Sequence, residues 1–382
     1  MTLDPYNYNP DTIDYQACAE NIYNGNGFSL KPVDDRLAHV PPVYPLFLAV
    51  LKVFEINDRI FIALIQIVLS MIPIIILFYF GKNILSDKTI LSFSILYILS
   101  PHMIYWSVQI LTENIAILLF TSSFIFFLVG FLKKEIKYYS YAMILISLSA
   151  FTRAVFIYVI PIYIVFLVYG SKKRIQTLVA TAVIAIMCLS PWIIRNYYKF
   201  NKVVLVTLGT GYIQTYQLAN FSEVYNDVIK KRLDSYSKGK EKYLHPVKSI
   251  DEYNGDKILT SIAMEMMKAH PRTTVKFFIQ NFYRFWSPGF SLFDEKIDYK
   301  YFVPTFLFTV FVIPLFLIGI REMLIINKFI FITIVLIIFY FTAVHTFFHG
   351  VIRYRAPIEP LIYFTSAFGV DYLIKAINDK LK

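Results

Sequence analysis

The segment Glu113-Asn-Ile-Ala-Ile-Leu-Leu-Phe-Thr-Ser-Ser-Phe-Ile-Phe-Phe-Leu-Val-Gly-Phe-Leu132 decides the fold class of this chain. It has the length of about 20 residues that an α-helix needs to cross a hydrocarbon core of ~30 Å. Its single charged residue is Glu113, at its start, and Lys133 and Lys134 follow its end. An apolar run with an acid at one end and lysines at the other predicts a membrane-spanning helix whose orientation is fixed.

Similar runs recur along the 382 residues, so we predict an all-α polytopic membrane protein. Hydrophobic residues make up 57% of the chain and charged residues 16%, a balance that excludes an ordinary soluble enzyme. About nine spans are expected: Ile60–Phe80, Thr89–Trp106, Glu113–Leu132, Tyr138–Thr152, Val155–Tyr169, Ile175–Ile194, Tyr301–Ile320, Phe329–His345 and Tyr354–Ile374. Tyr138–Thr152 and Val155–Tyr169 are short, which indicates a tilted or broken passage.

Lysines and arginines occupy every second connection between these spans, the pattern that marks the cytoplasmic side. The net charge of +11 is therefore a topology signal and does not indicate a nucleic-acid partner. The expected organisation is an outer first loop (1–59), a transmembrane bundle (60–194), an outer loop domain (195–300), and C-terminal spans with an inner tail (301–382). An N-terminus outside also predicts a leading span, which the sequence lacks.

Two further segments have the character of helices that lie on the membrane without crossing it. Val43–Ile56 is too short to span and follows prolines, and Arg272–Trp286 places apolar and basic residues at helical spacing. The alternative for both is ordinary packing within a soluble loop domain.

The predicted topology brings acids and bases together at the outer membrane face. The main candidates for chemistry are Asp11, Asp14, Glu113, Arg153, Arg195, Arg353 and Arg355. Further polar candidates are Tyr15, Asn196, His345 and His349.

Each candidate has a structural alternative. Asp11 is either the N-cap of a helix that begins at Thr12, or a general base or metal ligand. Glu113 either favours the dipole of its own helix or has a role in chemistry. Outer arginines suit a lipid phosphate, although snorkelling explains them as well. His345 and His349 share a helical spacing, but no third metal ligand is evident, so a divalent ion is only an option and no cofactor is certain.

Several motifs of nucleotide and hydrolase chemistry are absent from the sequence. It contains no phosphate-binding Gly-rich loop before Lys-Ser/Thr, no His-Glu-x-x-His and no Gly-x-Ser-x-Gly. A reaction on the outer face must then receive its activated group through the membrane, and a lipid-linked donor does this.

The chain contains, in order, Asp11, Tyr15, Ala19, Gly25-Asn-Gly27-Phe28-Ser29, Pro42-Val-Tyr44-Pro45-Leu-Phe47, Ser100-Pro101, Leu111-Thr112-Glu113, Thr152-Arg153, Pro191-Trp192-Ile-Ile-Arg195-Asn196 and Arg353-Tyr354-Arg355-Ala-Pro357. This order resembles the GT-C superfamily of membrane glycosyltransferases, in particular the branch of protein O-mannosyltransferases and lipid A aminoarabinose transferases. The resemblance covers nearly the whole chain. It implies a first span, missing here, followed by a loop with two juxtamembrane helices.

The resemblance also implies a function. One sugar would move from a polyprenyl-phosphate-linked donor to a lipid, glycan or protein acceptor outside the cytoplasmic membrane, with inversion. The family's catalytic acid falls on Asp11 and its second acid on Glu113, whereas the family usually has a small residue at the position of Asp14. The arginines or a divalent ion would stabilise the leaving phosphate. The Trp-Trp-Asp-Tyr-Gly signature of oligosaccharyltransferases is missing.

Two other classes remain open from sequence. A transporter or flippase of lipid-linked intermediates would have ionisable residues near the middle of its spans, and these are scarce. A non-catalytic, truncated relative would keep its stability and partners after loss of Asp11, Asp14 and Glu113. A related enzyme that modifies lipopolysaccharide or teichoic acid would use the same donor chemistry.

Overall fold

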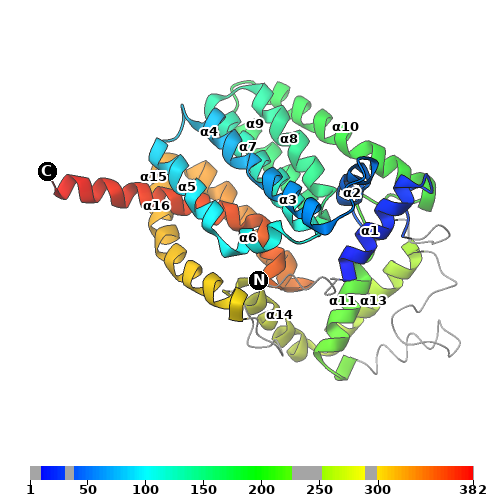
Figure 1. Ribbon diagram of the computed structural model, residues 1–382. Coiled ribbons are helices and arrows are strands. Elements are labelled where there is room, and N and C mark those ends of the chain that lie inside the picture. The colour runs from blue at the N-terminus through cyan, green and yellow to red at the C-terminus, as the bar shows by residue number, and fades with distance from the viewer. Residues whose placement is uncertain (1–9, 31–37, 226–251, 289–298, 382) are drawn as a thin grey trace, which may run out of the picture.

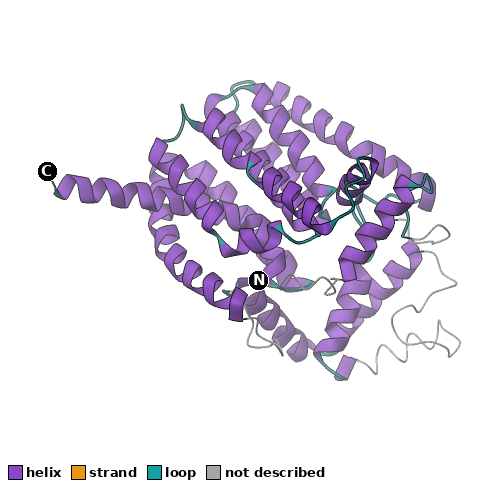
Figure 2. Cartoon of the chain, in the orientation of Figure 1, coloured by secondary structure: helices purple, strands orange, loops and turns teal. Residues whose placement is uncertain are grey.

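The computed structural model describes residues 10–30, 38–225, 252–288 and 299–381, and in these ranges it contains helices and short connections but no strand (Figures 1 and 2). The all-α class is confirmed. The α-helices are α1 Pro10–Tyr23, α2 Val43–Val53, α3 Arg59–Ser70, α4 Ile72–Gly81, α5 Asp87–Leu99, α6 Pro101–Ser107, α7 Thr112–Lys133, α8 Ile136–Ala150, α9 Val159–Gly170, α10 Arg174–Phe200, α11 Thr210–Phe221, α13 Glu252–Ala269, α14 Pro271–Trp286, α15 Tyr299–Phe347 and α16 Glu359–Lys380. Two 3₁₀ turns, η1 Ala154–Tyr158 and η2 Ile352–Ile358, precede α9 and α16.

Five helices in the described part of the chain are long and apolar enough to cross a membrane, or six with a bent pair, against the nine spans predicted. They are Arg59–Gly81 (α3 with α4), Thr112–Lys133, Arg174–Phe200, and Phe302–Ile325 and Asn327–Phe347 within α15. α5 and α6 form the bent pair, with an angle of 58° between them. The three other predicted spans do form helices, but α8 has 15 residues, η1 interrupts the next, and charged residues follow the apolar part of α16.

α7 is the central helix of the bundle, because 89% of its most apolar stretch is buried inside the structure. It contacts α3, α4, α8, α9 and η2. Phe127 stacks on Tyr163 of α9 with ring centroids 4.5 Å apart, and Phe124 meets Phe364 of α16 edge-on at 5.4 Å. A helix that is apolar on all sides is buried in a protein core or in lipid, and here neighbouring helices cover most of it. Its first turn, with Glu113, is consequently enclosed by neighbouring elements.

The N-terminal helices are attached to the same end of the bundle at which α7 begins. The Thr12 hydroxyl donates to the carbonyl of Ile110 at 3.0 Å, just before α7. The Val43 N–H at the start of α2 donates to the carbonyl of Phe151 at 3.0 Å, just after α8. α1, α2, α11 and α13 gather at this end, while the last turns of α16 extend from the opposite end (Figure 1).

The first half of α15 crosses α16 in very close contact through two glycines. A Cβ on Gly319 would lie 1.9 Å from the Thr365 carbonyl oxygen, and a Cβ on Gly369 would lie 2.1 Å from that of Leu315. Small residues allow such approach between helix backbones in a membrane, where packing drives association.

Gly319→Leu should therefore separate α15 from α16. We expect the free energy of unfolding to fall by about 1–3 kcal/mol or more, because the new side chain meets backbone atoms that cannot move aside. The apparent Tm of the purified protein in detergent measures this. Gly255→Ala is the control for adding a side chain to a helical glycine in open space, since a Cβ there meets nothing within 4 Å. Equal Tm values for Gly319→Leu and the parent would contradict the packing argument.

Candidate active site

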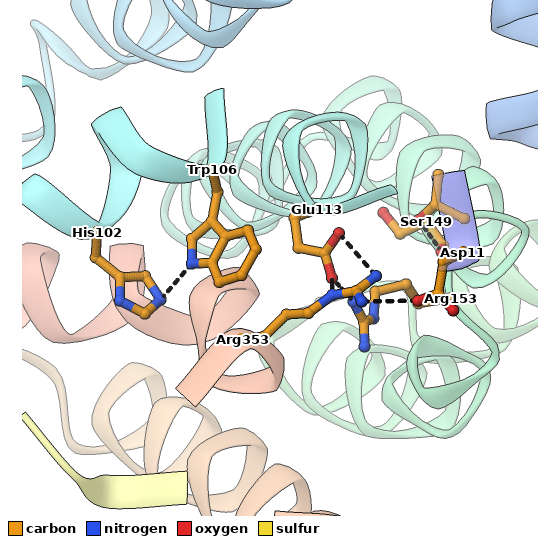
Figure 3. A network of polar contacts seen from close by, with 8 residues as sticks. Asp11, His102, Trp106, Glu113, Ser149, Arg153 and Arg353 are labelled. Atoms are coloured by element: carbon orange, nitrogen blue, oxygen red, sulfur yellow. Dashed lines mark hydrogen bonds and ion pairs between the residues drawn. The ribbon is translucent and has the colours of Figure 1, made fainter. Parts of the chain in front are cut away.

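A buried carboxylate, that of Glu113 in the first turn of α7, lies at the centre of a four-residue ionic cluster (Figure 3). It pairs with Nη1 of Arg153 and with Nε of Arg353, and Nη2 of Arg353 lies 3.4 Å from its second oxygen. Nη1 of Arg353 donates to Oδ2 of Asp11 at 2.7 Å. We call Asp11, Glu113, Arg153 and Arg353 the ionic cluster; its members come from four separate segments of the chain.

Local backbone geometry places the two arginines. The Thr152 hydroxyl and the Arg153 N–H both donate to the Ser149 carbonyl, at 2.6 and 3.0 Å, and so end α8 in a tight turn that directs Arg153 inward. Arg353 lies in η2, next to Tyr354. The Arg153 guanidinium lies over the Tyr354 ring, 4.5 Å from its centroid, and that ring stacks on His345 at 4.9 Å.

Exposure divides the ionic cluster into a buried part and an accessible part. The Glu113 side chain has no exposed surface, and those of Arg153 and Arg353 are 13% exposed, whereas Asp11 is 46% exposed. Burial is the largest influence on Arg353 and opposes its charged form, but Glu113, Tyr354 and Asp11 together outweigh burial and raise the pKa of the guanidinium. The Arg353 guanidinium thus stays charged, and Asp11 is the most accessible member of the ionic cluster.

Two uncharged candidates border the ionic cluster. Burial, together with the charges of Arg284 and Arg353, lowers the pKa of His349 to about 4, so its imidazole is neutral at pH 7. Its Nδ1 is buried without a hydrogen-bond partner among the described residues. Tyr15 is buried edge-on against Tyr44, with centroids 5.2 Å apart, and burial raises its pKa, so the phenol stays protonated.

Other predicted site residues make separate contacts. Arg355 pairs with Glu359 and donates to the carbonyls of Phe285 and Ser287 at 3.0 and 3.1 Å. Arg195 donates to the Phe28 carbonyl and to Asn196, each at 2.9 Å.

The Asn196 side-chain amide in turn donates to the Val204 carbonyl at 3.0 Å, and this hydrogen bond stabilises the turn after α10. The Asp14 carboxylate lies 3.6 Å from Nε2 of His39 and not at Arg353. α1 begins at Pro10, so Asp11 lies inside its first turn and not ahead of it as an N-cap.

Tyr354 and the pair of His102 and Trp106 were not among the site residues predicted from sequence. Trp106 Nε1 donates to Nε2 of the buried His102 at 3.0 Å (Figure 3). Their spacing of four residues on α6 is the signal that predicts such a contact. Within the described residues, no group of three or more His, Cys, Asp or Glu side chains is placed to hold a metal ion.

Part of the chain matches a known protein family. Residues 39–194 match the model of the dolichyl-phosphate-mannose-protein mannosyltransferase family. No curated protein and no solved structure matched the chain. The matched region runs from the residues before α2 into α10 and includes Glu113 and Arg153, while Asp11 and Arg353 lie outside it. Over residues 39–194, the chain is therefore similar to the membrane glycosyltransferases of this GT-C family.

Proposed function

We propose that this protein transfers one sugar from a polyprenyl-phosphate-linked donor to an acceptor hydroxyl on the extracytoplasmic face, with inversion and with Asp11 as the general base. The observation that carries the proposal is the ionic cluster, in which an accessible aspartate contacts an arginine that a buried glutamate holds. A base must reach the acceptor, and Asp11 is the exposed one of the two carboxylates in the ionic cluster.

The reaction needs one proton transfer and one displacement. Asp11 takes the proton of the acceptor hydroxyl, whose oxygen attacks the anomeric carbon of the donor. The bond between that carbon and the phosphate oxygen breaks, and polyprenyl monophosphate leaves with one more negative charge than the diester had. Positive charge placed where this charge develops lowers the barrier.

The ion pair between Asp11 and Arg353 couples these two events. When Asp11 accepts the proton it loses its negative charge, and its attraction for Nη1 of Arg353 weakens. The same guanidinium then has a donor to offer to the leaving phosphate, at the moment at which the phosphate gains charge. Glu113 keeps Nε of Arg353 in place during this exchange, and Arg153 adds a second positive charge.

The proposed location of the reaction follows from the two ends of α7. Glu113 and Lys133 are 20 residues apart on one helix, so about 30 Å separates them. Lysines mark the Lys133 end as cytoplasmic under the positive-inside rule, and the ionic cluster is then extracytoplasmic, at the plasma membrane. The proposed acceptor side is the loop of 195–300, whose described helices after α10 are α11, α13 and α14.

The direct test is transfer by the purified full chain in lipid vesicles. The assay compares a radiolabelled polyprenyl-phosphate sugar with the matching nucleotide sugar, each with a mixture of lipid, glycan and peptide acceptors. We expect label to move from the lipid-linked donor alone, and Arg353→Gln to lower turnover roughly 100-fold or more. Transfer from the nucleotide sugar, or movement of the intact lipid-linked sugar across the bilayer without transfer, would refute the proposal.

A further inference from the structure

A cavity of about 260 Å³ lies at the end of α7 opposite the ionic cluster. The end of α7, the start of α5, the break in α15 at Asn327 and the middle of α16 enclose it, with apolar walls that include Leu128, Leu132, Met323 and Phe364. Leu132 is 19 residues from Glu113, so the cavity is about 28 Å from the proposed reaction and independent of it. It is also far larger than the roughly 10–15 Å³ that one water requires.

The carboxylate of Asp371 is a charged group in the otherwise largely apolar wall of this cavity. Oδ2 of Asp371 accepts from the hydroxyls of Ser86 and Thr89 at 2.9 and 3.2 Å, and lies 3.2 Å from Nζ of Lys375. Oδ1 is buried and has no hydrogen-bond partner among the described residues, and Asp371 is only 6% exposed. A buried charged acceptor without a partner is costly, so this oxygen favours a donor from outside the described residues.

The charged and apolar residues that line the cavity indicate which kind of donor it favours. The carboxylate favours a cation with N–H groups, while Lys375, 64% exposed at the mouth, favours an anion beside it. The remaining walls favour a hydrocarbon chain. A primary ammonium next to a phosphate, at the end of an acyl chain, meets all three conditions.

We propose that this cavity binds an aminophospholipid of the leaflet at the lysine-rich end of the bundle. The ammonium group donates to Oδ1 of Asp371, the phosphate pairs with Lys375, and the chain lies along Leu128 and Leu132. Bound lipid thereby fixes α16 to the ends of α5 and α7. This inference does not depend on the proposed glycosyltransferase activity.

The test compares phosphatidylethanolamine with phosphatidylcholine of identical acyl chains. Both headgroups carry the positive charge, but the trimethylammonium of choline has no N–H donor. Each lipid is added in mixed micelles to the delipidated full chain, and the apparent Tm is recorded. We expect phosphatidylethanolamine to raise Tm by roughly 3 °C more than phosphatidylcholine does. Asp371→Asn should abolish the difference, and Asp379→Asn, an exposed change on the same helix, should preserve it.

Equal Tm increases from the two lipids, or a difference that survives in Asp371→Asn, would overturn the proposal. If Asp371→Asn does not fold, the parent protein with mono- and dimethylated ethanolamine lipids gives the answer, since the increase should fall as N–H groups are removed. No change along that series would also overturn it. Soluble phosphoethanolamine that raised Tm as much as the lipid would overturn the assignment of a lipid, because the acyl chain would then have no part in the site.

Discussion

Glu113→Gln is expected to lower the free energy of unfolding by about 3–5 kcal/mol and to abolish sugar transfer, because the change leaves two buried guanidiniums without their shared carboxylate. Glutamine is nearly isosteric, so the loss would come from charge and not from packing. Its amide offers one acceptor oxygen where Glu113 offers two, and its NH₂ group points a donor at a guanidinium that only donates. Chemical unfolding of the purified protein in detergent measures the first effect, and vesicle transfer the second.

The matched control for Glu113→Gln is Glu135→Gln. Within the described residues Glu135 pairs only with Lys137, and both are at the surface, so we expect no measurable change in unfolding or transfer. A double variant tests whether Glu113 and Arg153 interact. Arg153→Met should lower the free energy of unfolding less in the Glu113→Gln background than in the parent, because the ion pair between the two residues is already broken there. Additive losses would mean that Glu113 and Arg153 do not act on each other in solution.

The four members of the ionic cluster were among the larger set of residues predicted at the outer membrane face, because topology predicts depth in the membrane. Asp11, Glu113, Arg153 and Arg353 were all predicted at the outer ends of their segments, and the structure brings them into contact. Depth is a single coordinate, however, and the lateral position of a side chain depends on packing. Arg195 and Arg355 were predicted at the same level as Arg353, and each has different partners.

The separation of Arg353 from Arg355 has a simple geometric cause. They lie two residues apart in η2, and a 3₁₀ helix turns by about 120° per residue, so their side chains point in different directions. Arg353 reaches α7 and α1, while Arg355 reaches α14. Sequence patterns predicted no 3₁₀ turn at this position, and hence gave no reason to assign different roles to the two arginines.

The count of spans was less accurate for a related reason. Apolar runs indicate which residues avoid water, but not whether the helix continues through them. The predicted spans Val155–Tyr169 and Tyr354–Ile374 both start within 3₁₀ turns, η1 and η2, so the α-helices α9 and α16 begin only at Val159 and Glu359. The Ser100-Pro101 break was visible in the sequence, since Pro favours the first position of a new helix, yet Thr89–Trp106 was predicted as one span.

Asp11→Asn is expected to lower turnover of the lipid-linked donor by roughly 10²- to 10⁴-fold, because asparagine cannot take the proton of the acceptor. Donor binding should remain, since Glu113 still holds Nε of Arg353 and the new amide oxygen can accept from Nη1. Turnover in vesicles and binding of labelled donor in detergent measure the two quantities separately. The loss of charge at an accessible site should change the apparent Tm only slightly.

Asp14→Asn is the matched control for Asp11→Asn, since it makes the same chemical change one helical turn away on α1. Asp14 lies beside His39 and outside the ionic cluster, so turnover should stay within a few-fold of the parent. Equal turnover in Asp11→Asn and the parent would remove Asp11 from the chemistry. Because Glu113 is fully buried between two arginines and cannot meet an acceptor, Asp14 would then be the remaining carboxylate of the three that were predicted, and a loss of turnover in Asp14→Asn would identify it as the base.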